Sequence, residues 1–223
     1  MNNFFLKMKH WQLFLLLYLP IIVAMIFMFR SYYLFFTNIK DINNPLNPAE
    51  MFSFFSYTMP ISFIHYIVWV GYLLTILHAL NDRVPTQLKR NLTIPRLSII
   101  LPVLYSMTIC LFTYYLFQNF FDFDFEKLDN LSVRWMVASI IIIPCHLLAI
   151  FAILYSFYVL AKLLKTAEKQ RESDFEDFIA EFFFFWIFPI GIWFIQPRIN
   201  KLFEQEKPES QIEERSERKT DLG

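Results

Sequence analysis

The chain has 223 residues, of which 57% are apolar and 28 are Phe, and its mean hydropathy is +0.42. This composition excludes a soluble globular protein and places the chain in the membrane class. The 20 basic and 20 acidic residues give a formal net charge of zero, so the charge offers no reason to expect nucleic acid as a partner. No complete catalytic, nucleotide-binding or metal-binding motif is present, so the main predictions concern architecture.

Four stretches are apolar over about 20 residues, the length that an α-helix needs to cross the hydrocarbon core of a bilayer. We predict an all-α fold with membrane spans at residues 11–29, 61–80, 97–117 and 136–163. The first span is too long for the core of a signal peptide and is followed by Arg30, so we interpret it as a retained helix. Pro60 is expected to separate the second span from an interfacial segment before it. The fourth span is expected to continue as a helical stalk to Lys169.

Residues 182–195 form a fifth apolar stretch that is too short to cross a bilayer. At about 1.5 Å per residue this stretch reaches roughly 21 Å, which is less than the roughly 30 Å of hydrocarbon. Pro189 and Gly191 interrupt it, so a helix is expected to end or kink near Phe188. We predict a re-entrant or interface-lying helical hairpin, and a tilted, kinked fifth span is the alternative.

The segments on either side of this stretch favour a return to the side from which the chain entered. Ser173 followed by Glu176 predicts a capping box and therefore a helix start. Arg198 and Lys201 give a basic flank that favours the cytosol. The last 20 residues are mostly charged and polar and are predicted to be a disordered or solvated tail. We divide the chain into a transmembrane domain (1–171), the hairpin (172–203) and the tail (204–223).

The distribution of Lys and Arg predicts which side of the membrane each loop occupies, because short basic loops are retained in the cytosol. Ten basic residues lie in the N-terminal segment, the second loop and the stalk: Lys7, Lys9, Arg83, Lys89, Arg90, Arg96, Lys162, Lys165, Lys169 and Arg171. The two opposite loops hold only Arg30, Lys40, Lys127 and Arg134. We therefore predict that both termini are cytoplasmic.

Small residues on the third and fourth spans predict where these helices pack, because helix association in lipid depends on close approach of the backbones. At 100° per residue, Cys145, Ala149 and Ala152 share one face of the fourth span. Ser106 and Cys110 share one face of the third. The two faces are expected to form a packing seam with the two thiols at similar depth. A redox or metal role for the thiols is the alternative.

Three histidines are candidate cofactor ligands, because ionisable groups within a span are often functional. His65 and His78 are 13 residues apart on the second span, a spacing that resembles the paired haem ligands of b-type membrane cytochromes. His146 is a possible second ligand to a haem at His65. Helix packing through a neutral imidazole is the alternative, and we expect no cofactor. Pro144 and His146 together suggest a polar cavity in the outer half of the bundle.

The motif FFFFWIFPIGIWFIQPRINKLF at residues 182–203 resembles a group of uncharacterised small multi-pass membrane proteins of bacteria, chiefly Bacteroidetes. The opening KHWQLFLLL at residues 9–17 is also similar to that group. The resemblance implies a location in the bacterial inner membrane and assigns no catalytic residue. Within the motif, Gln196, Arg198 and Asn200 are candidate contacts for a partner or a lipid, with Arg198 binding a phosphate, a partner carboxylate or Glu181.

These patterns favour a non-enzymatic accessory, scaffold or sensor component of the membrane. A channel or carrier for a small solute is the first alternative, although the four spans contain no acidic side chain that would couple transport to an ion. A b-haem or metal-binding membrane protein is the second. The expected partners are the lipid bilayer and either another protein or a second copy of the chain.

Overall fold

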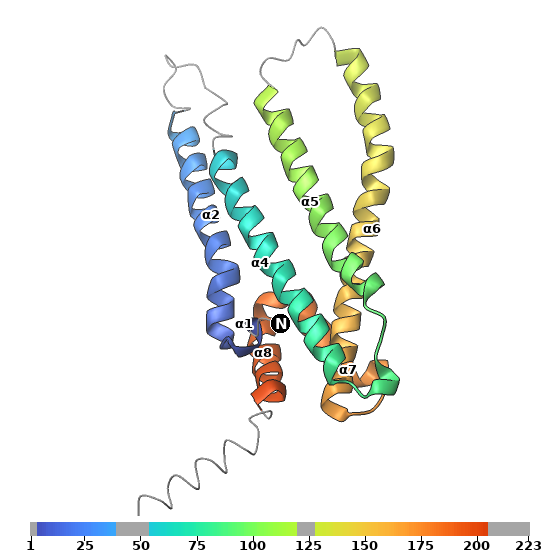
Figure 1. Cartoon of the computed structure of the whole chain (residues 1–223). Helices are drawn as coiled ribbons and strands as arrows, with labels where there is room; N and C mark the ends of the chain where they lie inside the picture. The colour runs from blue at the N-terminus through green and yellow to red at the C-terminus, as the bar shows by residue number, and fades with distance from the viewer. Residues whose placement is uncertain (1–3, 39–53, 120–127, 205–223) are drawn as a thin grey trace, which may run out of the picture.

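The computed structural model describes residues 4–38, 54–119 and 128–204, and within these ranges the fold is entirely helical (Figure 1). The elements are α1 (Phe4–Lys7), α2 (His10–Asn38), α4 (Phe54–Arg83), the 3-10 turn η1 (Thr86–Leu88), α5 (Thr93–Asn119), α6 (Leu128–Lys169), α7 (Phe175–Trp186) and α8 (Phe188–Glu204). The predicted disordered tail is residues 204–223; Glu204 is the last residue of α8, and residues 205–223 lie outside these ranges.

In the part of the chain that the structure describes, four helices are long and apolar enough to cross a membrane. Their candidate spans are His10–Leu34, Thr58–Arg83, Thr93–Tyr115 and Ser139–Lys169. This finding confirms the predicted fold class. Each of the four helices contains a proline, whose missing N–H leaves one carbonyl of the preceding turn without its helical partner.

Two helices begin earlier than their predicted spans, and α6 ends at Lys169 as predicted. α4 is continuous from Phe54 through Pro60, so Pro60 does not separate a lead-in segment from the span. The reason is local, because a proline in the second turn of a helix removes only one hydrogen bond near its start. α6 begins at Leu128 and runs without interruption to Lys169, so the span and the predicted stalk form one helix of 42 residues.

The long helices pack as two pairs, α2 with α4 and α5 with α6, and α4 also contacts both α5 and α6. Figure 1 shows the pairs close together at one end and apart at the other. We call the first end the base; it holds Arg83, Lys169, α1, α7 and α8. The fully buried large side chains gather toward the base: Leu13, Leu17, Tyr72, Leu73, Ile76, Leu77, Leu80, Leu160, Leu164, Phe178 and Phe185.

The far half of α6 has the opposite character. Ile140, Ile141, Leu148 and Phe151 are between 64% and 70% exposed. Large apolar side chains in such positions suit contact with lipid, where helices are held together by close packing and polar contacts instead of a water-excluding core. The tertiary core is therefore concentrated at the base.

α7 and α8 form a hairpin whose corner is Ile187, with φ −90° and ψ 58°. The predicted helix end before Pro189 is confirmed, and Pro189 occupies the first turn of α8, where its missing N–H needs no helical acceptor. The predicted capping box is wrong. α7 is preceded by Asp174 at the N-cap, which makes no side-chain cap hydrogen bond, and Ser173 is instead fully buried one residue earlier.

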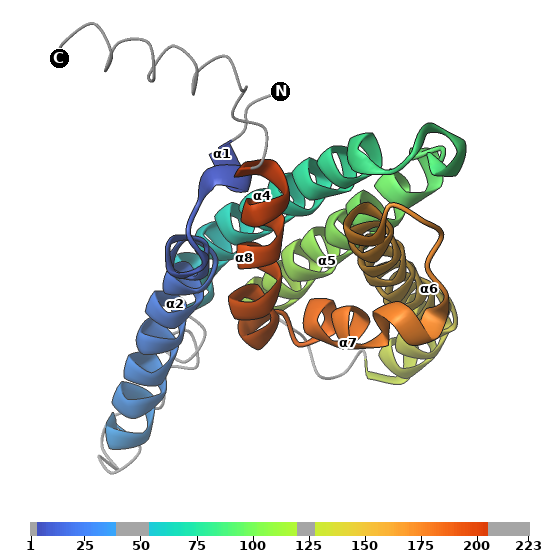
Figure 2. The same cartoon turned by 90° about the horizontal axis from the view of Figure 1, so that it is seen from below.

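The hairpin packs between the two helix pairs at the base (Figure 2). α7 lies against α6, and α8 lies against α1, α2 and α7. The Phe188 ring at the start of α8 contacts Trp69 and Tyr72 of α4, with centroid separations of 6.5 and 5.6 Å. At the other end of α8, Cζ of Arg83 lies 4.7 Å from the centroid of the Phe203 ring. The hairpin therefore connects all parts of the base.

Candidate functional site

Two places in the described residues gather polar side chains that include candidates from the sequence. The first is the base, where Gln196, Arg198 and Asn200 of α8 lie. The second is a cavity between α2 and α4 in the far half of the molecule. Both places contain residues that the sequence singled out, together with partners that it did not.

Gln196 is fully buried and joins three segments of the chain. Its Nε2 donates to the carbonyl oxygens of Phe5, at 2.8 Å, and Met8, at 3.1 Å. Its Oε1 accepts a hydrogen bond of 2.9 Å from the hydroxyl of Tyr72 on α4. The carbonyls of Phe5 and Met8 belong to α1 and the turn after it, where a short helix leaves acceptors without backbone donors. Gln196 thus supplies hydrogen-bond donors to α1 and the turn after it, which we call the N-terminal corner.

Asn200, one turn further along α8, completes this cluster. Its Nδ2 donates to the Met8 carbonyl at 2.9 Å, and its Oδ1 accepts from Nε2 of Gln196 at 2.9 Å. We call Tyr72, Gln196, Asn200 and the carbonyls of Phe5 and Met8 the amide cluster. Because the amides of Gln196 and Asn200 meet groups of the chain itself, the cluster holds the N-terminus, α4 and α8 together.

Arg198 lies beside the amide cluster and joins α8 to α6 and α7. Its Nε donates to Oε1 of Glu168 at 2.6 Å, and its Nη2 donates to the other Glu168 oxygen in a two-pronged contact. The same Nη2 lies 2.7 Å from Oε1 of Glu181. Lys165 Nζ also donates to Oε1 of Glu181, at 3.0 Å. Of the three roles considered for Arg198, pairing with Glu181 is the one made within the chain.

Two more ion pairs connect the end of α6 to the segment that follows it. Lys162 Nζ lies 3.0 Å from Oε1 of Glu172, and Lys169 pairs with Asp177. Lys162, Lys165 and Lys169 are three and four residues apart, so they share one face of α6. That face meets the acidic side of α7. We call these pairs, together with Arg198, Glu168 and Glu181, the ionic cluster.

Glu181 is the most buried acidic residue of the ionic cluster, with 2% of the residue exposed. Burial by itself would raise the pKa of its carboxyl, but hydrogen bonds from Arg198 and Lys165 hold that pKa below its ordinary value. Burial likewise acts to lower the pKa of Arg198, and the bonds to Glu168 and Glu181 raise it. Glu181 Oε2 is buried and has no hydrogen-bond partner in the described part of the chain. The cluster is thus charged and partly buried.

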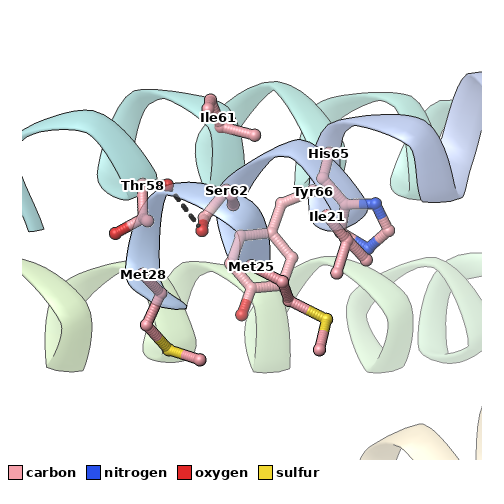
Figure 3. A pocket seen from close by; sticks show the side chains of 9 residues that line it. Ile21, Met25, Met28, Thr58, Ile61, Ser62, His65 and Tyr66 are labelled. Carbon is pink, nitrogen blue, oxygen red and sulfur yellow. Dashed lines mark hydrogen bonds between the residues drawn. The ribbon is translucent and has the colours of Figure 1, made fainter. Parts of the chain in front are cut away.

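The cavity between α2 and α4 has a volume of about 350 Å³ and contains His65 (Figure 3). Its lining consists of Ile21, Ala24, Met25, Met28, Thr58, Ile61, Ser62, His65 and Tyr66. His65 Nδ1 lies 2.8 Å from the carbonyl oxygen of Leu17 on α2, and the Tyr66 hydroxyl lies 2.8 Å from Ser106 Oγ on α5. The far half of the bundle therefore does hold a partly polar cavity, which lies at His65.

The three histidines have different neighbours. His65 bonds to α2, the ring of His146 lies 6.0 Å from that of Tyr105 on α5, and His78 Nδ1 lies 3.3 Å from Nη2 of Arg96. These contacts direct the rings of His65 and His146 to different partners, so the structure does not bring them together as a pair of ligands to one iron. In the described ranges, no group of three or more His, Cys, Asp or Glu side chains is placed to hold a metal ion.

The predicted seam between α5 and α6 is closest near the base. Ser156 Oγ donates to Ser98 Oγ at 2.9 Å, and both residues are buried. Further out, the Tyr105 hydroxyl donates to the Ile142 carbonyl at 3.3 Å. The Ile142 carbonyl is two residues after the Ile140 carbonyl. The Ile140 carbonyl lacks its helical hydrogen-bond donor, because Pro144 has no N–H.

The five residues selected for the seam are placed as follows. Ser106 bonds to Tyr66, so it faces α4. Cys110 is half-buried, Cys145 is exposed, and both are free thiols. Ala149 and Ala152 are half-buried on α6, where the Ala152 carbonyl also accepts from Ser156.

Several residues of both places were not identified from the sequence. Nothing in the sequence marks Tyr72 as part of the amide cluster, because a buried tyrosine and a lipid-facing tyrosine look the same within an apolar run. Lys165 and Glu168 had a usable signal, namely basic residues at helical spacing on α6 followed by the acidic residues of α7.

Comparisons with known proteins do not add an assignment to this geometry. No family model, no curated protein and no solved structure matches the chain.

Proposed function

We propose that the chain is a multi-pass protein of a bacterial inner membrane, with both termini in the cytosol, and that it acts as a non-enzymatic scaffold or accessory component. The excess of Lys and Arg in the segments at the base supports this orientation. The resemblance of residues 9–17 and 182–203 to bacterial multi-pass proteins supports the choice of membrane.

We further propose that the α7–α8 hairpin re-enters the membrane from the cytosolic side. Phe188 at the corner lies beside Tyr72, whereas Phe203 at the end of α8 lies beside Arg83. Tyr72 precedes Arg83 by 11 residues, which corresponds to about 16 Å along α4. The corner thus lies deeper in the bundle than the end of α8, by roughly half of the ~30 Å hydrocarbon thickness.

The outer face of the hairpin supports the same placement. Large apolar side chains on this face are between 40% and 57% exposed: Ile179, Phe183, Trp186, Ile187, Ile190, Trp193 and Phe194. A contiguous apolar surface of this kind is unusual for a segment in water and is typical of a helix embedded at the level of the lipid headgroups and acyl chains. The opposite face carries the buried residues Phe185, Ile192 and Ile195.

The observation that carries the scaffold proposal is the connection of one hairpin to every other part of the base. The amide cluster joins α8 to the N-terminus and α4, and the ionic cluster joins α8 and α7 to α6. The described charged side chains of the ionic cluster are engaged with one another, an arrangement that favours a fixed platform over a catalytic centre. The exposed end of α8, at Lys201, is then a contact point for a cytosolic partner.

Cysteine accessibility tests the topology. In a background with Cys110 and Cys145 replaced by Ser, single cysteines are introduced at Thr86, Ile187 and Lys201. A membrane-impermeant maleimide is expected to label Thr86→Cys and Lys201→Cys only from the cytosolic side, and Ile187→Cys from neither side. Labelling of Lys201→Cys from the outer side would show that the hairpin is a fifth span and would reject the re-entrant placement.

Site-specific photo-cross-linking in cells tests the scaffold role. A photoreactive amino acid at Lys201 is expected to give a discrete protein adduct. The same amino acid at Ile67, which is 66% exposed on α4, serves as the lipid-facing control and is expected to give none. Adducts that are indistinguishable between the two positions contradict the scaffold proposal.

A second candidate function is the handling of a small apolar solute, and the cavity between α2 and α4 is the observation that favours it. Flux of a solute across liposomes that contain the purified protein would support a channel or carrier. Unchanged leakage relative to empty liposomes would reject it.

A further inference from the structure

The cavity between α2 and α4 has one apolar wall and one polar wall. α2 contributes Ile21, Ala24, Met25 and Met28, whose spacing of three and four residues places them on one face. α4 contributes Thr58, Ser62 and His65 at the same spacing, with Ile61 and Tyr66 beside them. Figure 3 shows the side chains of the two helices around the same space. The polar atoms thus lie along one edge, facing methionine and aliphatic carbon.

Two side chains of the polar wall, Ser62 and His65, present hydrogen-bond acceptors. Ser62 Oγ uses its hydrogen on the Thr58 carbonyl, at 2.9 Å, which leaves the oxygen lone pairs available. The Leu17 carbonyl can only accept, so His65 Nδ1 carries the hydrogen of their 2.8 Å contact, and Nε2 of the neutral ring is an acceptor. Ser62 and His65 are about 4.5 Å apart along α4, within reach of one small polar group.

The contact between His65 and Leu17 lies in the turn of α2 that contains Pro20. Pro20 has no N–H to donate to the Leu16 carbonyl, which directly precedes the Leu17 carbonyl in the chain, so this turn of α2 has one backbone hydrogen bond fewer than a regular turn. His65 supplies a donor from the neighbouring helix. The tautomer and orientation of His65 are therefore set by the fold, and the cavity keeps an acceptor wall as long as His65 donates to the Leu17 carbonyl.

We propose that this cavity binds an uncharged amphiphile from the membrane, with a hydroxyl group that donates to His65 Nε2 or Ser62 Oγ and a hydrocarbon part that packs on Met25 and Met28. A hydroxyl fits because an acceptor wall needs a donor. An ammonium would also donate, but the lining holds no carboxylate to offset the burial of its charge. A volume of about 350 Å³ is at the lower end of ligand pockets, which suits one chain and not a large ring system.

The flexible side chains of Met25 and Met28 support an aliphatic occupant, because methionine adapts to chains of varied shape. The proposal rests on the proposed membrane location, since the ligand is expected to enter from lipid between α2 and α4. It does not rest on the placement of the hairpin or on the scaffold role.

Photolabelling of the full-length protein in lipid nanodiscs tests the proposal. The probe is dodecan-1-ol with a diazirine in the middle of its chain, and the matched probe is its methyl ether, which has the same chain but no donor. Mass spectrometry maps labelled peptides. The alcohol is expected to label the Ile21–Met28 segment about fivefold more than the ether, the ratio expected for one net hydrogen bond.

Three variants define the site. Ser62→Ala removes one hydrogen-bond acceptor and adds no bulk between the helices. It is expected to reduce the ratio of alcohol to ether labelling. Met25→Trp fills the cavity and is expected to abolish labelling of this segment by both probes. Ile67→Ala, at an exposed position of α4 outside the lining, is expected to change neither. Elution volume and circular dichroism confirm that each variant is folded.

Equal labelling by the alcohol and the ether overturns the proposal, as does labelling that Met25→Trp leaves unchanged. The cysteine topology experiment is independent of this readout. If cysteine labelling shows a fifth span and photolabelling depends on the cavity, the hairpin placement is rejected and the ligand site is kept. If cysteine labelling shows re-entry and photolabelling does not depend on the cavity, the hairpin placement is kept and the ligand site is rejected.

Discussion

A Cβ atom added at Gly191 would lie 1.7 Å from the carbonyl oxygen of Phe184, so the backbones of α7 and α8 touch at this point. Phe184 and Phe194, whose rings stack at 4.7 Å, lie on the two arms of the same crossing. A glycine is required here because the obstructing atom belongs to the backbone and cannot rotate away.

Gly191→Ala is therefore expected to force the arms of the hairpin apart and to destabilise the protein by about 1–3 kcal/mol or more. The measurement is thermal unfolding of the detergent-solubilised protein, followed by circular dichroism. Gly71→Ala is the matched control, since its Cβ would lie 3.5 Å from Cε2 of Phe5, an ordinary contact, and alanine favours a helix. Equal unfolding temperatures for the two variants would contradict the close crossing.

Replacement of Gln196 by Leu is expected to release the N-terminal corner. The substitution keeps the size of the side chain but leaves the Tyr72 hydroxyl and the Phe5 carbonyl without partners, at a cost of about 1–3 kcal/mol for each buried group that remains unsatisfied. Hydrogen exchange of the amides at residues 4–9 is expected to accelerate. Tyr72→Phe, which removes only one bond of the amide cluster, is expected to give a smaller effect, and the absence of any difference from wild type in either variant counts against the cluster.

The stability of the base is expected to fall in acid because of Glu181. Its pKa in the folded protein lies below the ordinary value of about 4.5, so its contribution is complete above that pH and is lost as the pH falls through the folded pKa. Glu181→Gln is expected to flatten the decrease of the unfolding temperature below about pH 4.5. Glu172→Gln is the control, because the Glu172 side chain is 64% exposed and its substitution is expected to change the acid limb much less. An acid limb unchanged in Glu181→Gln rejects this assignment.

The seam between α5 and α6 makes a prediction for the two native thiols. Ser98 and Ser156 are paired at 2.9 Å, and in an antiparallel pair the residue twelve beyond Ser98, Cys110, lies opposite the residue twelve before Ser156, Pro144. Cys145 is adjacent to Pro144, so the two thiols are expected at similar depth. A bifunctional thiol reagent is expected to link Cys110 to Cys145 within one chain.

A positive control for this cross-link is available in the same helices. In a background that lacks Cys110 and Cys145, the double variant Ser98→Cys and Ser156→Cys is expected to form a disulfide on mild oxidation, because the two side chains already meet. The products are read as mobility shifts on non-reducing gels. A disulfide at the engineered pair with no link at the native pair would show that the helices diverge away from the base.

The four spans could be predicted from long uninterrupted apolar runs, because the length and composition of a span are properties of consecutive residues. The helix break before Pro189 was predictable for the same reason, since proline acts on the turn that contains it. The exact start of α7 was not, because Ser173 and Asp174 are both favoured N-cap residues and burial of Ser173 decided between them. The continuity of α4 through Pro60 was not predicted either, because the effect of a proline depends on where the helix begins, and α4 begins six residues before it.

The sequence by itself determined that this chain forms several membrane-length helices followed by a short, broken apolar hairpin, because those features follow from hydropathy and from the local effect of proline and glycine. Only the tertiary structure decided which polar groups meet. Gln196 reaches carbonyls about 190 residues earlier, and His65 reaches Leu17 across 48 residues. No local pattern encodes such pairs, because a buried polar group is satisfied by whichever partner the packing of the helices places within hydrogen-bond distance.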